Sequence, residues 1–282
     1  MTTTLPDAQQ RVAATYNAAS DFYDHPANSW SRFGERTIAR LGLKPAARVL
    51  DVCCGTGAAA IPAAEAVGPA GSVLGIDLAE DLLHLARAKV RSRGMSNIEF
   101  RLGDMLDLRL PDTQFDAVVC VFGIFFVPDM TGAVRELWRM VRLGGQLAIT
   151  TWGRNLFEPL NSVFWNAVRE LRPELHKAFN PWDRIGDPAA LRDVLRAAGV
   201  ARAEIVAENG THPIPSAEHW WALILGSGYR GTLEQLDAES RERVREVNFA
   251  FIRASRVETV EANVIYAVAT KSPSVARELA LS

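Results

Sequence analysis

The sequence predicts an α/β fold with a doubly wound, mostly parallel sheet of seven strands and a helical insertion. Three observations support this prediction. Short apolar segments alternate with helix-like segments from residue 45 onward, which is typical of a parallel sheet covered on both faces. Glycines or acidic residues follow the ends of several apolar segments. Hydrophobic residues make up 48% of the chain and charged residues 23%, which predicts a packed core.

The N-terminal segment is expected to be helical. The patterns predict one helix over Asp7–Asp24 and a second over Ser31–Leu41. Pro45 then ends the helical pattern, because proline lacks a backbone N–H and restricts the residue before it.

Five strands and their intervening helices are expected next. The strands are Arg48–Val52, Ser72–Asp77, Ile98–Leu102, Phe115–Val121 and Gln146–Trp152. An alanine-rich helix ends at Ala66, and further helices cover Glu80–Arg93 and Asp129–Val141. Ligands of such sheets bind at the carboxyl ends of the strands, near the point where strand order reverses.

The rest of the chain is less regular. Helices are expected at Leu156–Leu171 and Pro188–Ala198, and strands at Arg202–Ala207 and Asn263–Thr270. The long segment between these strands, Glu208–Glu258, is interpreted as an inserted helical cap. We therefore divide the chain into an N-terminal helical segment (1–44), a core (45–207), the cap (208–258) and a last strand with its tail (259–282).

Composition excludes several classes of protein. The net charge of −2 and pI near 6.2 argue against nucleic-acid binding, which needs a basic surface. The number of cysteines is odd, three, and two of them are adjacent, which indicates a reducing compartment. The histidines form no recognisable metal site. The N-terminus lacks a signal-peptide core, and the apolar run Ala117–Val127 is too short to span a bilayer. We expect a soluble cytoplasmic protein without a membrane span, and a homodimer remains open.

The loop after the first strand has the composition of a ligand-binding turn. Gly55, Thr56 and Gly57 let a ligand approach the backbone, and the next helix offers unpaired N–H groups. Asp51 lies at the end of the strand, where it would repel a pyrophosphate and attract an ammonium group. The alternative is a tight turn in which Asp51 only accepts hydrogen bonds from loop N–H groups.

Acidic residues also follow the second and third strands. Asp77 can accept from two ribose hydroxyls, or can simply cap the helix that follows. Asp104 can accept from the exocyclic amine of adenine while Met105 packs on the ring; otherwise it is a solvated loop carboxylate. Three acids at three consecutive strand ends favour a common site.

These motifs resemble those of class I S-adenosylmethionine (SAM) dependent methyltransferases, including the type 11 methyltransferase group. The resemblance covers about Ala47 to Trp152 and rests on these segments: Val49–Gly57, Gly75–Asp77, Gly103–Met105, Phe115–Val119 and Leu143–Leu147. Phe122–Asp129 is similar to the quinone-ring C-methyltransferases, whereas the chain after Thr150 does not follow them. Cys53 stands where the family often has Gly or Ala, and Leu143 replaces a usual Pro.

The resemblance implies a Rossmann-like methyltransferase with SAM as cofactor and a small-molecule methyl acceptor. It places the methionine part of SAM at Asp51 and the glycine loop, the ribose at Asp77, and the adenine at Asp104 and Met105. The N-terminal segment would fold over this pocket. The candidate cofactor residues are Tyr23, Trp30, Asp51, Cys53, Gly55, Thr56, Gly57, Asp77, Leu78, Asp104, Met105 and Val121.

The acceptor is expected to be apolar or aromatic, and the atom that is methylated (O, N or C) stays open. Candidate acceptor residues are Phe126, Trp220, Trp221, Tyr229 and Arg230, the last as a partner for an anionic group. His212 and His25 are candidate acid–base residues, although structural roles are the alternative for both. Two other functions remain open: a SAM-binding enzyme without methyl transfer, such as a cyclase, and an NAD-dependent oxidoreductase, since Gly55–Ala60 fits a loose G-x-G-x-x-A pattern.

Overall fold

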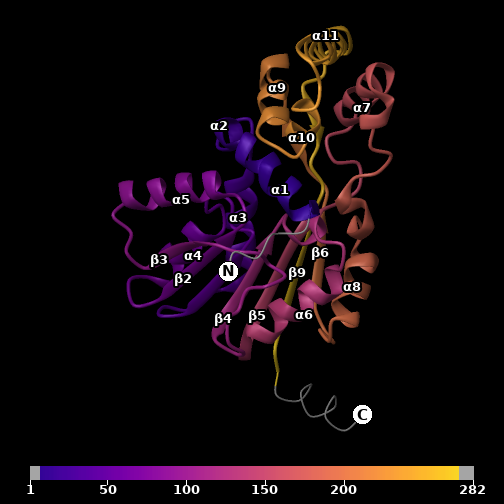
Figure 1. Ribbon diagram of the computed structural model, residues 1–282. Helices are drawn as coiled ribbons and strands as arrows, with labels where there is room; N and C mark the ends of the chain where they lie inside the picture. The colour runs from indigo at the N-terminus through magenta and orange to yellow at the C-terminus, as the bar shows by residue number, and fades with distance from the viewer. Residues whose placement is uncertain (1–6, 273–282) are drawn as a thin grey trace.

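The computed structural model describes residues 7–272, and Figure 1 shows a seven-stranded sheet within them. The strand order is β3-β2-β1-β4-β5-β9-β6, in which β1 to β5 run parallel and β9 is antiparallel to both its neighbours. The predicted doubly wound, mostly parallel sheet is therefore confirmed. The strands are β1 Arg48–Val52, β2 Ser72–Asp77, β3 Ile98–Leu102, β4 Phe115–Val121, β5 Val141–Trp152, β6 Glu204–Glu208 and β9 Val264–Thr270.

Helices cover both faces of the sheet. On one face lie α3 (Trp30–Leu41), α4 (Ala60–Val67) and α5 (Glu80–Ser92); on the other lie α6 (Met130–Met140) and α8 (Pro188–Ala197). Small side chains allow a close approach on the first face: a Cβ on Gly34 of α3 would lie 2.0 Å from the Ala58 carbonyl oxygen. Three alanines of α4, Ala60, Ala63 and Ala64, are buried where the helix packs on β1 and β2.

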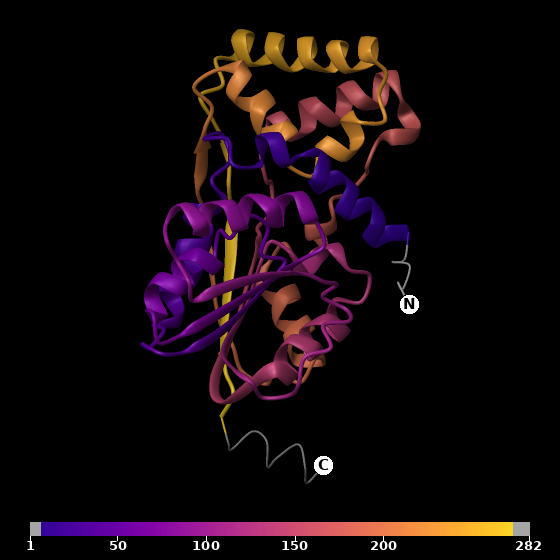
Figure 2. The ribbon, with the colours of Figure 1, turned by 60° about the vertical axis from the view of Figure 1, so that its left-hand side comes forward.

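A second group of helices lies beyond one end of the sheet, as Figures 1 and 2 both show. We call α7, α9, α10 and α11 the cap layer. Between it and the sheet pass α1 and α2, and a two-stranded antiparallel ribbon of β7 and β8 joins the layer to the core. The bounds are α1 Asp7–Ala18, α2 Ser20–Tyr23, α7 Leu160–Leu171, α9 Ala217–Leu225, α10 Arg230–Leu233, α11 Ala238–Ser255, β7 Thr211–Pro213 and β8 Thr259–Glu261.

Several predicted boundaries were wrong. The expected helix Asp7–Asp24 is broken at Ala19, so that α2 leaves α1 at an angle and turns over the strand ends. The segment Glu208–Glu258, expected to be helical, begins with strand β7. The strand expected at Arg202–Ala207 runs over Glu204–Glu208, and the helix expected from Leu156 begins at Leu160.

Strand β5 starts earlier than its sequence pattern suggests. It begins at Val141 because Val141 pairs with Phe115, and the pairing then slips so that Ala117 faces Gln146. Gly144, with φ of +79°, lies within this irregularity, and its N–H donates to the Lys271 carbonyl at 2.7 Å. The glycine pair therefore accommodates a bulge rather than a turn before the strand.

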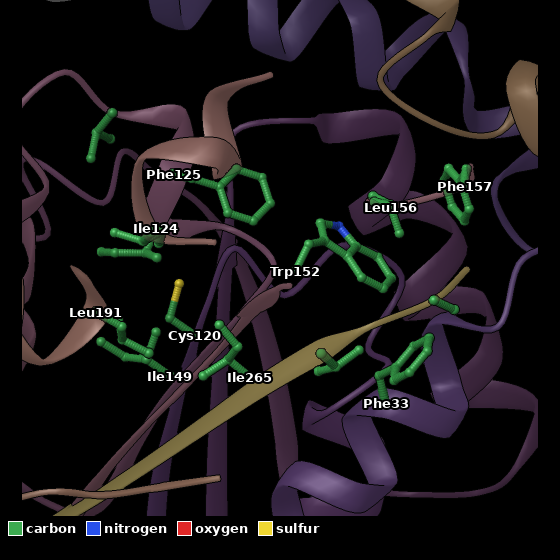
Figure 3. Packing of buried hydrophobic residues seen from close by; sticks show 14 of the residues in the cluster. Phe33, Cys120, Ile124, Phe125, Ile149, Trp152, Leu156, Phe157, Leu191 and Ile265 are labelled. Carbon is green, nitrogen blue, oxygen red and sulfur yellow. The ribbon is translucent and has the colours of Figure 1, made fainter. Parts of the chain in front are cut away.

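The larger hydrophobic core extends from the sheet to the cap layer. Figure 3 shows Cys120, Ile149 and Ile265 on the sheet, and Trp152 beside Leu156 further along. Because this core is continuous, the cap layer packs on the sheet through buried side chains. Between residues 7 and 272, no helix combines the length and the apolar character needed to cross a bilayer.

Candidate active site

A cavity opens at the carboxyl ends of the parallel strands, where β1 lies between β2 and β4 and the strand order reverses. Its lining joins strand-end residues to α1, to the end of α2 and to a short segment of the cap layer, Ser227–Tyr229. It brings together eleven of the residues that the sequence singles out: Tyr23, Trp30, Asp51, Cys53, Asp77, Leu78, Asp104, Met105, Val121, Phe126 and Tyr229.

Asp51 is the most unusual group in this lining. Its side chain is 1% exposed, and neither carboxylate oxygen has a hydrogen-bond partner within residues 7–272. Burial raises the pKa of Asp51 well above its usual range, the nearby Asp77 raises it further, and the backbone N–H of Ala60 opposes the rise. A buried carboxylate without a partner is costly, so this position suits a cationic group in the cavity.

Asp77 is held by the backbone. Its Oδ2 accepts from the Gly55 N–H at 2.8 Å and its Oδ1 from the Ala79 N–H at 2.9 Å. Burial raises the pKa of Asp77, while these two hydrogen bonds oppose the rise. Asp77 therefore holds the start of α5 and the glycine loop and also forms part of the cavity wall. Each of its oxygens can still accept a further hydrogen bond.

The third acid follows β3. Asp104 Oδ1 accepts from the Leu106 N–H at 2.9 Å, which closes a short turn and leaves Asp104 at the cavity wall. Met105, beside it, is 5% exposed and lines the same part of the cavity. Asp51, Asp77 and Asp104 form what we call the acidic half of the cavity.

The glycine loop needs unusual backbone conformations. Gly55 and Gly57 have φ of +52° and +90°, and a Cβ on Gly55 would lie 2.9 Å from the hydroxyl oxygen of Tyr23. Cys53 also has a positive φ, +62°. Its side chain fits because the neighbouring residue is Gly123, where a Cβ would lie only 2.4 Å from the Cys53 Cβ. The loop can therefore be closely covered by Tyr23.

Thr56 lies on the far side of this loop, and the three loop residues Gly55, Thr56 and Gly57 are outside the cavity lining. The Thr56 hydroxyl donates to Asp24 at 2.7 Å and accepts from Lys89 at 2.9 Å. Lys89 also donates to Asp24 at 2.7 Å. This network ties α5 and the glycine loop to the end of α2.

The other half of the cavity is aromatic. Phe122 and Trp152 follow β4 and β5, and their rings stack with centroids 3.8 Å apart. Around them lie Trp30, within 6.3 Å of both rings, and Phe157, 6.0 Å from Trp152. We call this part the aromatic half, and its members are Phe122, Phe125, Phe126, Trp152, Phe157, Trp182 and Tyr229.

Charge in the described lining is of one sign. Its ionisable side chains are the three aspartates, three tyrosines and two cysteines, and this lining contains no Lys, Arg or His. Arg230 pairs with Glu234 at 2.6 Å instead of facing the cavity. Tyr229 does line the cavity, and its hydroxyl donates to Asn161 Oδ1 at 2.7 Å.

The two candidate histidines lie together at the junction of the N-terminal segment and β7. His212 is 5% exposed, its Nδ1 is 3.2 Å from the Ser29 hydroxyl, and burial followed by repulsion from His219 lowers its pKa to about 4. The Nδ1 of His25 accepts from the Ala27 N–H at 3.1 Å, and its ring is 6.4 Å from that of His219. Both residues are outside the cavity lining.

The cap tryptophans pack inside the cap layer. Trp220 is fully buried and its Nε1 donates to Asn248 Oδ1 at 2.9 Å. The ring of Trp221 lies edge-on to Phe249 at 6.5 Å. Neither lines the cavity.

Sequence reasoning missed much of the aromatic half and the covering helix. Phe122 and Trp152 could have been found, because they lie at the carboxyl ends of β4 and β5 as the acids lie at those of β1 to β3. Gln9, Val12 and Tyr16 lie on one face of α1, with helical spacing. In contrast, Trp182 reaches the cavity from a short 3₁₀ helix, Pro181–Ile185, which the sequence analysis did not expect.

This fold and cavity define a SAM-dependent methyltransferase of class I. A model of the ubiE/COQ5 methyltransferase family matches residues 7–181, and the chain belongs to that family. The demethylmenaquinone methyltransferase of Listeria welshimeri is 32% identical over 176 residues, which cover 61% of this chain and 75% of that protein. Family membership sets aside the NAD-dependent oxidoreductase.

Two solved structures share the fold. Phosphoethanolamine N-methyltransferase 2 of Haemonchus contortus, in complex with phosphomonomethylethanolamine and S-adenosylhomocysteine, is 16% identical with a TM-score of 0.59, over 95% of this chain and 61% of that one. The [4+2]-cyclase SpnF is 18% identical with a TM-score of 0.58, over 95% of this chain and 98% of that one. At these identities the comparison concerns the fold alone.

Proposed function

We propose that this methyltransferase transfers the methyl group of SAM to a ring carbon of a neutral, quinone-type acceptor. The observation that carries the proposal is the division of one cavity into an acidic and an aromatic half. SAM carries positive charge at its sulfonium and ammonium groups, which suits buried carboxylates. A planar ring suits apolar aromatic walls.

In this proposal the acidic half binds SAM. The partnerless carboxylate of Asp51 fits the ammonium group, since that contact would supply the missing hydrogen bonds. Asp77 fits the ribose hydroxyls with the lone pairs that its backbone contacts leave free, and Asp104 fits the adenine amine. Met105 offers an apolar surface for the adenine ring. When bound, SAM supplies an electrophilic methyl group.

The acceptor is proposed to be neutral. An anionic acceptor would face Asp51, Asp77 and Asp104 without any cationic side chain in the described lining. The name of the Listeria relative, a demethylmenaquinone methyltransferase, supports a quinone-type ring. The stacked Phe122 and Trp152 rings offer it a flat apolar wall.

The chemistry needs little from an acid–base side chain. The acceptor's ring carbon gives an electron pair to the methyl carbon, the bond from methyl to sulfur breaks with its electrons staying on sulfur, and the ring proton leaves to water. The hydroquinone form of a quinone is electron-rich enough for this step. The protein's part is then to align the two molecules and to exclude water.

A panel of acceptors tests the proposal. The purified protein is incubated with SAM and either reduced demethylmenaquinone or phosphoethanolamine, and S-adenosylhomocysteine is measured with the mass of the product. We expect a gain of one methyl group on the quinol and none on phosphoethanolamine. Methylation of the anionic acceptor alone would contradict the proposal, as would conversion of neither acceptor by a protein that binds SAM.

A further inference from the structure

Tyr16 lies on the boundary between the two halves of the cavity. Its ring is edge-on to Phe126, in the aromatic half, at 5.5 Å, and edge-on to Tyr23, which covers the glycine loop, at 6.0 Å. The negative charge of Asp77 acts on its hydroxyl. From the cap layer, a Cβ on Gly228 would lie 3.7 Å from the hydroxyl oxygen.

This boundary is where methyl transfer has to occur. The acidic residues lie at or just beyond the carboxyl ends of β1, β2 and β3, and Phe122 and Trp152 lie at the carboxyl ends of β4 and β5. Because the strand order is β3-β2-β1-β4-β5, the two sets occupy neighbouring parts of one sheet edge. A cofactor in one part and an acceptor in the other therefore meet beside Tyr16.

The Tyr16 hydroxyl has no hydrogen-bond partner among residues 7–272, although Tyr16 lines the cavity. Two other hydroxyls of this lining are committed: Tyr229 donates to Asn161 at 2.7 Å and Ser227 to the Ile224 carbonyl at 3.2 Å. The hydroxyl of Tyr23 lies over the glycine loop, where a Cβ on Gly55 would be 2.9 Å from it. Burial and the charge of Asp77 raise the pKa of Tyr16, so the hydroxyl keeps its proton. It is a hydrogen-bond donor on a side chain that lines the cavity, and the described residues offer it no acceptor.

We infer that the Tyr16 hydroxyl donates a hydrogen bond to an oxygen of the acceptor ring and thereby holds the neighbouring ring carbon in line with the sulfonium of SAM. The inference rests on the proposed function, because it assumes an oxygen-bearing ring in the aromatic half. Tyr16 forms no covalent bond and keeps its proton throughout. Its effect is on binding and alignment of the acceptor.

The variant Tyr16→Phe tests this role, since it removes one oxygen and keeps the ring that packs on Phe126. With reduced demethylmenaquinone as acceptor, we expect kcat/KM to fall about tenfold, the factor that one hydrogen bond provides. The Kd of SAM, measured by calorimetry, should change less than about twofold, because the hydroxyl contacts only the acceptor. An unchanged kcat/KM would overturn the inference, and so would a loss confined to SAM affinity.

Tyr266→Phe is the matched control. Tyr266 is 2% exposed, its hydroxyl also lacks a hydrogen-bond partner, and it lies outside the cavity lining with its ring under Arg40. The same chemical change there should leave kcat/KM and SAM affinity as they are. A tenfold loss in both variants would mean that removal of any buried tyrosine hydroxyl impairs the enzyme, and would overturn the specific role of Tyr16.

A binding experiment separates this inference from the proposed function. In the presence of S-adenosylhomocysteine, we expect the wild type to bind 1-naphthol about tenfold more tightly than naphthalene, and Tyr16→Phe to lose that preference. This result would support the inference even if no quinol were methylated, in which case only the proposed function would fail. The same preference in both proteins, or none in the wild type, would contradict the inference.

Discussion

The rings of Phe122 and Trp152 stack with centroids 3.8 Å apart and planes inclined by 8°. The two residues are distant in sequence, but they follow adjacent parallel strands, β4 and β5, whose last pair is Val121 and Thr150. Phe122 takes a positive φ of +56°, and its N–H donates to the Thr150 carbonyl at 2.9 Å. A sharp turn of the backbone therefore brings its ring onto that of Trp152.

Removal of one ring should reveal how much this stack contributes. Trp152 is 4% exposed and contacts Phe33, Phe122 and Phe157, so Trp152→Ala should lower the free energy of unfolding by about 3–5 kcal/mol. Urea unfolding measures the change. Phe179→Ala, at a side chain 62% exposed, is the control and should cost less than about 0.5 kcal/mol. Similar losses of unfolding free energy in the two variants would show that the stacked rings are not part of a tightly packed cavity lining.

The buried Asp51 predicts a pH dependence of stability. Its pKa in the folded protein lies above the ordinary value of 3.8, so the folded state binds the proton more tightly than the unfolded state. The free energy of unfolding should then fall as the pH rises above 3.8 through the raised pKa. When the free energy of unfolding is compared with that of the wild type over pH 4 to 8 without SAM, Asp51→Asn should lack the part of this fall that Asp51 causes. Parallel pH profiles of the two proteins would argue that Asp51 has another partner.

His212 predicts the opposite dependence. Its pKa is lowered from 6.5 to about 4, so its contribution to stability is present above pH 6.5 and is lost as the pH falls toward 4. His212→Gln should flatten the stability profile in that window. Because His212 is outside the cavity lining, methyl transfer at pH 8 should change less than about twofold. A large fall in kcat at pH 8 with normal SAM affinity would instead make His212 a base.

The contacts of Asp24 predict a kinetic effect. Asp24 accepts from both Lys89 and Thr56, which ties the end of α2 to the glycine loop. Asp24→Asn should raise the dissociation rate of SAM by up to about fivefold, because a partly exposed ion pair contributes no more than about 1 kcal/mol. Stopped-flow fluorescence measures the rate, and Arg93→Met, which removes an exposed ion pair with Glu65, is the control. Equal SAM dissociation rates in wild type and Asp24→Asn would show that this contact does not hold α2 over the cavity.

The sequence predicted the parts of the molecule in which local pattern determines structure. The buried strands β1 and β4 are mostly apolar, and a turn or loop follows each, so their ends and the acids at the ends of β1, β2 and β3 could be located without a structure. The same strand-end argument would have found Phe122 and Trp152.

The rest depends on contacts between segments far apart in sequence. Trp220 and His212 are residue types that often occur in binding sites. Tertiary packing, however, brings Trp220 to Asn248 and His212 to Ser29. Tyr16 enters the cavity only because the chain breaks at Ala19 and α2 turns over the strand ends. No local pattern specifies such packing, because the same side chains would bury equally well against other partners.

Calorimetric titration of wild type and Asp51→Asn tests most directly whether the partnerless carboxylate of Asp51 receives the positive charge of SAM. We predict that SAM and S-adenosylhomocysteine both bind the wild type, that NAD does not, and that both affinities fall tenfold or more in Asp51→Asn through loss of a charge-assisted hydrogen bond. Asp107→Asn, at an exposed ion pair, should bind both ligands as the wild type does. Undiminished SAM affinity in a folded Asp51→Asn protein would contradict the account.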